Sequence, residues 1–196
     1  MVSQYDGRTM RRTRNRAAVI TALLSLIREG DLEPNADAVS ERAGVSARSL
    51  FRYFDDLADL LATAIAQDLE AAQPLTVIPR LGEGPLEDRI SRLVDSRLAL
   101  FEQVGTTVKV ANFRASSVPA IAVVLGEFRA PLRPQLAEHF SMELSKMSSA
   151  DSTSIIDAIV AITGSESYYL HRQGRERSIE RTKYSWNTSL VALLQN

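Results

Sequence analysis

The sequence predicts an all-α protein built from about nine helices. Apolar residues recur three and four positions apart along most of the 196 residues, which is the period of an amphipathic helix. No segment alternates apolar and polar residues with a period of two over a useful length, as a half-buried strand does. Clusters of Gly, Pro and Ser separate the apolar stripes, as helix ends and loops do.

The first helix is predicted from about Thr13 to Glu29. Its apolar stripe comprises Ile20, Leu23, Leu24 and Ile27. Gly30 and Pro34 then end the helix, because both residue types disfavour a helix interior. Asn35 is suited to cap a second, short helix that ends at Ala43.

The segment 44–54 is predicted to form a turn and a third helix. Gly44 tolerates the left-handed backbone of a sharp turn, and the Ser46 hydroxyl can cap the helix that follows. Val45 and Leu50 are expected to face inward. The outward-facing set is then Ala47, Arg48, Phe51 and Arg52. The first three helices therefore indicate a helix-turn-helix.

A fourth helix is expected next, with Asp55 and Asp56 as its caps. Its apolar stripe comprises Leu57, Leu60, Leu61, Ala64, Ile65 and Leu69. This stripe lets the helix pack on the first three and continue toward the rest of the chain. Between Gln73 and Pro85, a cluster of Pro and Gly residues predicts a loop and a change of structural unit.

Everything after this loop is again predicted to be helical. Pro119 suits the first turn of a helix, whereas Pro131 and Pro134 must kink or interrupt that helix. The stretch Ser145–Ser154 is expected to form a loop and a helix start. The remaining helices are expected at Leu86–Val104, Thr106–Ser116, Pro119 to about Leu144, Ile155–Arg172 and about Arg177–Leu194, the last two flanking a turn at Gly174.

The charge is distributed unevenly along the chain. The net charge is −1, but the first 54 residues hold nine Arg and six acidic residues. Nine minus six gives +3, so the remainder carries −4. A basic N-terminal part on an acidic body is the layout of a DNA-binding domain joined to another domain. The alternative is a solvated Arg-rich terminus, but the Arg residues at positions 8–16 cluster directly before the apolar stripe of the first helix.

Composition narrows the function classes. The absence of Cys excludes disulfides and thiolate chemistry, and it fits a reducing cytoplasm. No signal peptide is expected, and no apolar run is long enough to span a membrane, so a cytoplasmic location is expected. The two histidines, His139 and His171, lie far apart, and neither a phosphate loop nor a nucleophile elbow is present. We therefore expect no cofactor and no metal, and an enzyme is the disfavoured alternative.

The outward-facing set of the third helix fits a DNA major groove. A small Ala permits close approach, while Arg48 can donate two hydrogen bonds to a guanine edge. Phe51 can contact thymine methyl groups, and Arg52 can reach a phosphate. The alternative is an ordinary amphipathic helix with a solvated basic face. The basic N-terminal setting and the preceding helix-turn-helix favour DNA binding.

The chain resembles the TetR family of transcriptional regulators. The resemblance is carried by Ala43-Gly44-Val45-Ser46, by Leu50-Phe51-Arg52-Tyr53-Phe54 and by Leu60-Leu61, and it is specific over residues 13–61. Beyond them it is architectural only. The resemblance implies a homodimer with a helix-turn-helix DNA-binding domain at residues 1–55 and a larger helical ligand-binding and dimerisation domain at 56–196.

The resemblance also implies roles for individual residues. Arg48 and Ala47 would contact base edges, and Phe51 the groove wall. Phosphate contacts would come from Asn35, Ser46, Ser49, Arg52 and Tyr53. Arg11, Arg12 and Arg14 could add contacts as a flexible arm, or could simply be solvated.

The chain departs from the family at two positions. The family usually has Tyr where this chain has Phe51, and Lys where it has Leu57 after two acids. We therefore expect the fourth helix to contribute less to DNA affinity here.

A ligand site is suggested by Arg97, which shares one helical line with Ile90, Val94 and Phe101. A buried Arg needs an anion. The anion would belong to a ligand, or Arg97 would reach solvent or pair with an acid such as Asp88. Further candidate lining residues are Phe101, Asn112, Arg114, Phe128 and Tyr168.

The last two predicted helices carry apolar stripes that suggest a dimer interface. These stripes comprise Ile155, Ile159, Ile162 and Tyr169, and Ile179, Trp186, Leu190 and Leu193. Pairing with a symmetry mate would form a two-fold four-helix bundle. The alternative is that both stripes are covered within one subunit.

The expected function is a homodimeric regulator, with repression as the expected sign, that binds a pseudo-palindromic DNA operator and is released by a small-molecule inducer. The alternative is a helical DNA-binding regulator controlled by a protein partner.

Overall fold

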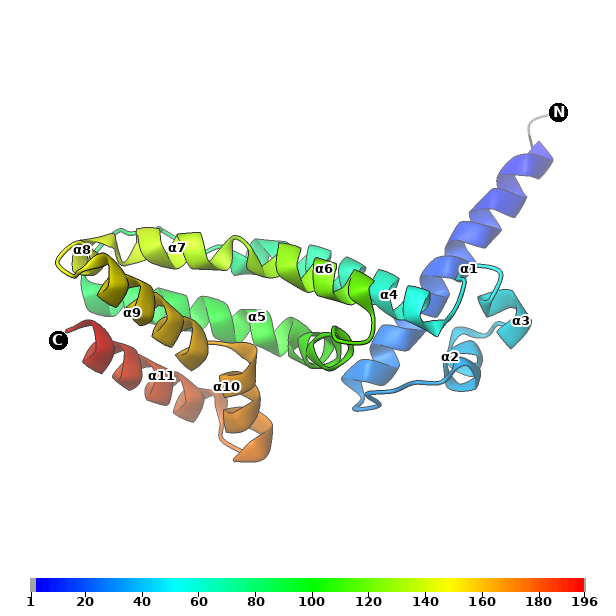
Figure 1. Cartoon of the computed structure of the whole chain (residues 1–196). Helices are drawn as coiled ribbons and strands as arrows, with labels where there is room; N and C mark the ends of the chain where they lie inside the picture. The colour runs from blue at the N-terminus through cyan, green and yellow to red at the C-terminus, as the bar shows by residue number, and fades with distance from the viewer. Residues whose placement is uncertain (1–2, 196) are drawn as a thin grey trace. The chain divides into compact units, whose positions relative to one another are not determined.

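The computed structural model describes the backbone of residues 3–195 and the side chains of residues 9–195. Every regular element in these residues is a helix and none is a strand, so the predicted all-α class is confirmed there (Figure 1). In chain order the elements are α1 (Ser3–Arg28), α2 (Ala36–Ala43), α3 (Ala47–Leu50), α4 (Leu57–Ala72), the 3₁₀ turn η1 (Gln73–Thr76), α5 (Leu86–Arg114), α6 (Pro119–Arg129), α7 (Leu132–His139), α8 (Ser141–Leu144), α9 (Ser149–Ile162), α10 (Ser165–Tyr169), the π turn η2 (Leu170–Gly174) and α11 (Ile179–Leu194).

Contacts divide the described chain into two compact units. Unit 1 comprises residues 3–69 and 106–125, and unit 2 comprises residues 70–105 and 126–195. In unit 1, α1 packs on α2 and α2 on α3. In unit 2, α9 packs on α7 and α11 (Figure 1). These units are defined by contacts alone, so the functional division into residues 1–55 and 56–196 stays a prediction.

Helix α1 begins earlier than expected. It starts at Ser3 rather than about Thr13. The five good helix formers among residues 3–12, Gln4, Arg8, Met10, Arg11 and Arg12, favour this extension, and Gly7 opposes it. The predicted stripe is confirmed. Its buried members, including one that the sequence analysis did not name, are Val19, Ile20, Leu23, Leu24 and Ile27.

Both ends of α2 and the start of α3 lie where the sequence predicts them. Helix α3 already ends at Leu50, so Phe51 and Arg52, expected on its outward face, lie in the turn that follows it. The Asn35 side chain accepts a hydrogen bond from the Ala38 amide at 2.9 Å and caps α2. Gly44 has a φ of 65°, and its backbone turns the chain out of α2. The Ser46 hydroxyl accepts from the Ser49 amide at 3.2 Å and caps α3.

The start of α4 is capped reciprocally. The Asp56 Oδ1 accepts from the Asp59 amide at 2.8 Å, and the Asp59 carboxylate accepts from the Asp55 amide at 3.1 Å. The prediction that both acids cap α4 is thus confirmed for Asp56. It is wrong for Asp55, which contributes its backbone amide as a donor to the Asp59 carboxylate. The α4 stripe is buried from Leu60 onward, whereas Leu57 is half-buried.

The loop predicted from Gln73 to Pro85 begins with a short helix. Gln73–Thr76 form η1, in which Pro74 occupies an early position. Proline fits there because the first amides of a helix have no partner within it. The remainder, from Val77 to Pro85, is loop as predicted.

The two helices predicted at Leu86–Val104 and Thr106–Ser116 form the single helix α5. Gly105, the one residue between the two predicted ranges, lies inside this helix and has a packing role. A Cβ at this position would lie 3.2 Å from a ring carbon of Tyr168, closer than ordinary van der Waals contact. Gly105 therefore lets α10 approach α5, and this packing offsets its low helix propensity.

The helix predicted from Pro119 to about Leu144 is interrupted as expected. It divides into α6, α7 and α8, and Pro131 and Pro134 lie where α7 begins.

The helix predicted at Ile155–Arg172 also divides, into α9, α10 and η2. The break is at Gly164, where a Cβ would lie 2.7 Å from the Val160 carbonyl oxygen, so the chain requires glycine there. The start of α11 is capped by Ser178, whose hydroxyl accepts from the Arg181 amide at 3.2 Å. No helix among the described residues is both long and apolar enough to cross a membrane.

Candidate nucleic-acid interface

The helix-turn-helix exposes the side chains that the sequence assigns to DNA. Leu50 and Phe54 are 0% and 2% exposed and fix α3 and the turn after it to unit 1. Phe51 is 47% exposed, and Arg48 and Arg52 are exposed as well. A large exposed aromatic side chain and two exposed Arg side chains can contact base edges and phosphates. Ala47, also assigned to base edges, is half-buried.

Two contacts attach this surface to α1. The Asn15 amide nitrogen donates to the Tyr53 hydroxyl oxygen at 3.3 Å. Because Tyr53 accepts this bond, its own O–H can still donate to a phosphate. The Arg16 guanidinium lies 4.9 Å from the centre of the Phe54 ring. Both contacts join residues far apart in sequence, and the sequence analysis identified neither.

The polar residues at the helix starts are partly used in capping. The Ser46 hydroxyl accepts from the Ser49 amide and donates to the Ser49 hydroxyl at 3.0 Å. The Ser49 hydroxyl hydrogen therefore remains for a phosphate, whereas the Ser46 hydroxyl is engaged in the cap. Asn35 uses its carbonyl oxygen as a cap, which leaves its NH₂ group for an anion.

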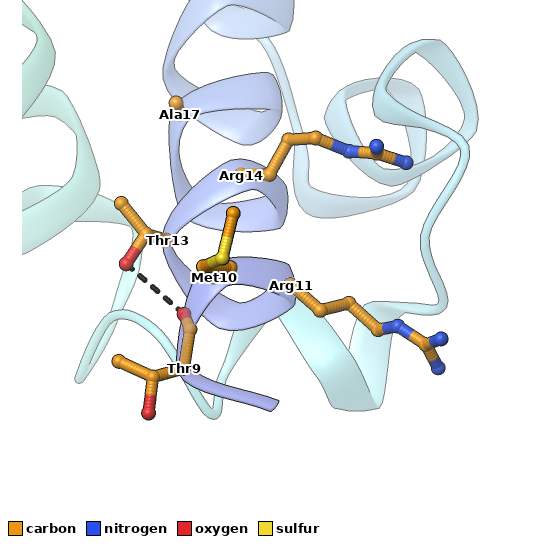
Figure 2. Close-up of a pocket in the computed structure, with 6 residues that line it drawn as sticks. All are labelled: Thr9, Met10, Arg11, Thr13, Arg14 and Ala17. Carbon is orange, nitrogen blue, oxygen red and sulfur yellow. Dashed lines mark hydrogen bonds between the residues drawn. The ribbon is translucent and has the colours of Figure 1, made fainter. Parts of the chain in front are cut away.

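The N-terminal arginines lie on a helix and not on a flexible arm. Arg11, Arg12 and Arg14 are exposed on α1, so the flexible arm, one of the two alternatives, is wrong for these residues, and their contact with DNA stays a prediction. An open pocket of about 670 Å³ runs along this helix, and Figure 2 shows its lining residues: Thr9, Met10, Arg11, Thr13, Arg14 and Ala17. In that view Arg11 and Arg14 extend to one side and Thr9 and Thr13 to the other.

An acidic pair follows the basic surface. Asp55 and Asp56 are exposed, and Asp56 is engaged in capping α4. A carboxylate at this helix start occupies the position where a phosphate would otherwise be attracted. This arrangement is the reason to expect that α4 adds little to DNA affinity, and the expectation stays a prediction.

The residues predicted to line a ligand site are divided between the two units. Arg97 is buried on α5 in unit 2, where Phe101, Phe128 and Tyr168 are buried too. Asn112 and Arg114 belong to unit 1, and the Arg114 Nη1 donates to a Glu33 carboxylate oxygen at 2.9 Å. Arg114 thus has an anion among the described residues, but its Nε is buried without a hydrogen-bond partner, so its assignment to a ligand stays a prediction.

The residues predicted for the dimer interface differ in how deeply they are buried. Ile159, Trp186 and Leu190 are almost fully buried within unit 2, so their assignment to an interface is corrected. Their side chains form the core of the subunit, and the Trp186 indole N–H donates to the Ser167 hydroxyl at 3.0 Å. The other candidates are half-buried: Ile155, Ile162, Tyr169, Ile179 and Leu193. Exposed apolar residues that the sequence analysis did not assign to the interface are Val160, Leu170 and Tyr184.

Within the described residues, no three His, Asp or Glu side chains come together as a possible metal site. His139 is buried in unit 2, where its ring bonds to the backbone at Gly82 and Arg89. His171 is half-buried, and its Nδ1 lies 2.9 Å from the Ser167 carbonyl oxygen. The two histidines therefore have separate structural partners.

No protein-family model and no curated protein matches the sequence of the chain. Solved structures do match its fold. A TetR-family transcriptional regulator from Streptomyces coelicolor matches with a TM-score of 0.70 and 18% identity, over 91% of this chain and 81% of that one. A transcriptional regulator from Rhodococcus sp. Rha1 matches with a TM-score of 0.69 and 14% identity, over 94% of this chain and 96% of that one. The multidrug binding protein EbrR, complexed with imidazole, matches with a TM-score of 0.59 and 19% identity, over 94% of each chain.

Proposed function

We propose that this chain, which has the fold of the TetR-family transcriptional regulators, is a DNA-binding regulator of that family. One observation carries the proposal: Arg48, Phe51 and Arg52 are exposed on a capped helix-turn-helix whose Leu50 and Phe54 are buried. A solvated amphipathic helix does not need an exposed Phe between two arginines, whereas a groove-reading helix uses it.

In this proposal each exposed residue has a defined role. Arg48 donates two hydrogen bonds to a guanine edge, and Arg52 contacts a phosphate. Tyr53 is held by Asn15 and donates its O–H to a second phosphate. The base contact selects the sequence, while the phosphate contacts fix the register of the protein on the duplex.

The regulator acts as a homodimer on a pseudo-palindromic operator, with one recognition helix in each half-site. The proposed interface lies on α9, the end of α10, η2 and α11. Support comes from the apolar residues there that the subunit leaves half-buried or exposed: Ile155, Val160, Ile162, Tyr169, Leu170, Ile179, Tyr184 and Leu193.

A small molecule bound in the helical body releases the repressor from its operator, and the protein acts in the cytoplasm. A structural relative that is a multidrug binding protein in complex with imidazole supports ligand binding by this fold. The ligand must bind the DNA-free form better, and a preference of about 1–3 kcal/mol would weaken operator binding roughly 5- to 150-fold.

The proposal is tested by selecting bound fragments from sheared DNA of the host genome. We expect enrichment of fragments that contain an inverted repeat, with two protomers bound to each fragment. The matched control is the double variant Arg48→Ala, Arg52→Ala, whose fold is checked by circular dichroism. A wild-type protein that enriches no fragment above random DNA at physiological salt would refute the proposal.

A further inference from the structure

Arg97 lies in the middle of the buried face of α5. Its side chain is only 3% exposed. Neighbouring positions on the same helix face, one turn before and one turn after it, are Leu93, Val94, Leu100 and Phe101, and all are buried. A guanidinium is therefore surrounded on its own helix by apolar side chains.

No group among the described side chains compensates this charge. Among residues 9–195, no hydrogen bond or ion pair involves Arg97, and its Nη1 is buried without a partner. Burial lowers the pKa of Arg97 to about 10, which still leaves the side chain protonated at neutral pH. A buried, charged and unpaired guanidinium costs free energy that a folded protein does not ordinarily retain.

Arg89 provides a comparison on the same helix, because it is as deeply buried, at 1% exposed. Its Nε donates to the Gly84 carbonyl oxygen at 3.1 Å, and its Nη1 donates to the His139 carbonyl oxygen at 2.7 Å. Both Nη atoms also donate to the Glu143 carboxylate, at 2.8 and 2.6 Å. Each guanidinium nitrogen of this structural buried arginine thus has a hydrogen-bond partner, whereas the Arg97 Nη1 has none.

The acids that could have paired with Arg97 are engaged or distant. Asp95 accepts from the Lys183 ammonium at 2.5 Å. Glu102 accepts from the Tyr168 hydroxyl and from Arg172. Asp88, the partner considered from the sequence, is exposed and has no ion pair with Arg97. No acid among the described residues pairs with Arg97, so we expect a bound molecule to supply the compensating anion.

We propose that Arg97 anchors the carboxylate of a small, otherwise apolar ligand inside unit 2. The guanidinium fork matches a carboxylate with two parallel hydrogen bonds. Phe101, four residues further along the same face, offers an apolar wall and lies 5.5 Å from the Tyr168 ring, centre to centre. This inference rests on the proposed function, because it names the chemical class of the molecule to which the regulator responds.

The first arm of the test needs no ligand. In Arg97→Met, an apolar side chain of similar length replaces the unpaired charge, so thermal unfolding should occur about 2–4 °C higher than in wild type. The matched control is Arg89→Met, which leaves Glu143 without its partner and should unfold at a lower temperature. If Arg97→Met is destabilised like Arg89→Met, Arg97 is a structural residue and the proposal fails.

The second arm uses two matched probe pairs, decanoate with decanamide and 4-butylbenzoate with 4-butylbenzamide, measured by calorimetry on DNA-free protein. At least one acid should bind wild type about tenfold or more tightly than its amide. Arg97→Met should lose this preference, and Arg97→Lys should keep part of it. Equal affinity for acid and amide, an unchanged preference in Arg97→Met, or no binding of any probe would overturn the carboxylate assignment.

DNA binding is measured separately on wild type with the selected fragments. Failure to bind DNA would refute the proposed regulator and leave the calorimetric result standing. Loss of acid selectivity with intact DNA binding would refute only the role of Arg97.

Discussion

Arg28 of α1 and Asp68 of α4 form an ion pair inside unit 1, and Asp68 is only 5% exposed. The second carboxylate oxygen of Asp68 accepts from the Thr107 hydroxyl of α5 at 2.6 Å. One buried carboxylate therefore connects three helices. Because α1 also holds Tyr53 through Asn15, this carboxylate belongs to the packing that supports the recognition surface.

Asp68→Asn should destabilise the protein by about 1–3 kcal/mol, because the amide keeps the shape but removes the charge that compensates Arg28. Urea unfolding measures this loss. The matched control is Asp157→Asn, which breaks the exposed ion pair with Arg133 and should cost about 1 kcal/mol or less. Equal losses in the two variants would contradict the special role of Asp68.

The residues that local rules position were predictable from the sequence. Asn35, Gly44 and Ser46 act within a few positions of themselves, so their residue types alone indicate where α2 begins and ends and where α3 begins. The ion pairs were not predictable. Arg28 and Asp68 lie 40 positions apart, and Arg89 and Glu143 lie 54 apart.

Two features of the sequence indicate a buried ion pair and a single continuous helix. Asp68 lies in line with the apolar stripe of α4, and an acid in such a stripe predicts a buried partner. Gly105 lies between two stripes that share one helical register, and this continuity favours a single helix over a break. The tight contact that favours glycine there is with Tyr168, which α10 brings to α5 only in the folded chain.

Arg48→Ala and Arg52→Ala should affect DNA binding in different ways. Loss of Arg48 should cost about 1–3 kcal/mol on the operator and little on random DNA, because it removes a base contact. Loss of Arg52 should weaken binding to both DNAs and reduce the salt slope by about one, because it removes a phosphate contact. Fluorescence anisotropy across a salt series measures both effects. An equal loss on both DNAs for Arg48→Ala would exclude its base-reading role.

Val160→Glu should weaken the dimer at least about tenfold, because it places a charge in the proposed apolar interface on α9. Light scattering over a concentration series measures the dissociation. Deleting α11 is a poor test, since Trp186 and Leu190 form the subunit core. The matched control is Met142→Glu, which changes an exposed apolar residue on α8 outside the proposed interface. If both variants dimerise like wild type, the interface lies elsewhere.

His139 should make the stability of unit 2 depend on pH between about 7 and 5. The Gly82 amide donates to its Nδ1 at 3.0 Å, and its Nε2 donates to the Arg89 carbonyl oxygen at 2.9 Å, so the folded ring is neutral. Burial is the main cause that lowers the pKa of His139 below its ordinary 6.5. The hydrogen bond with the Arg89 backbone opposes this shift, the charges of Arg92 and Arg89 lower the pKa further, and the charge of Glu143 raises it. The unfolded chain then binds more protons as the pH falls below about 6.5, so the free energy of unfolding decreases.

His139→Gln removes this titration, so its free energy of unfolding should fall less steeply than that of wild type over the same range. The difference in slope approaches about 1.4 kcal/mol per pH unit where only the unfolded chain is protonated. Urea unfolding at half-unit pH intervals measures it. Glu143 provides an internal control. Its hydrogen bonds with Arg89 hold its pKa below the ordinary 4.5, so its contribution is lost only below that pH, in both proteins alike. Identical slopes for the two proteins between pH 7 and 5 would show that His139 is not held neutral by the fold.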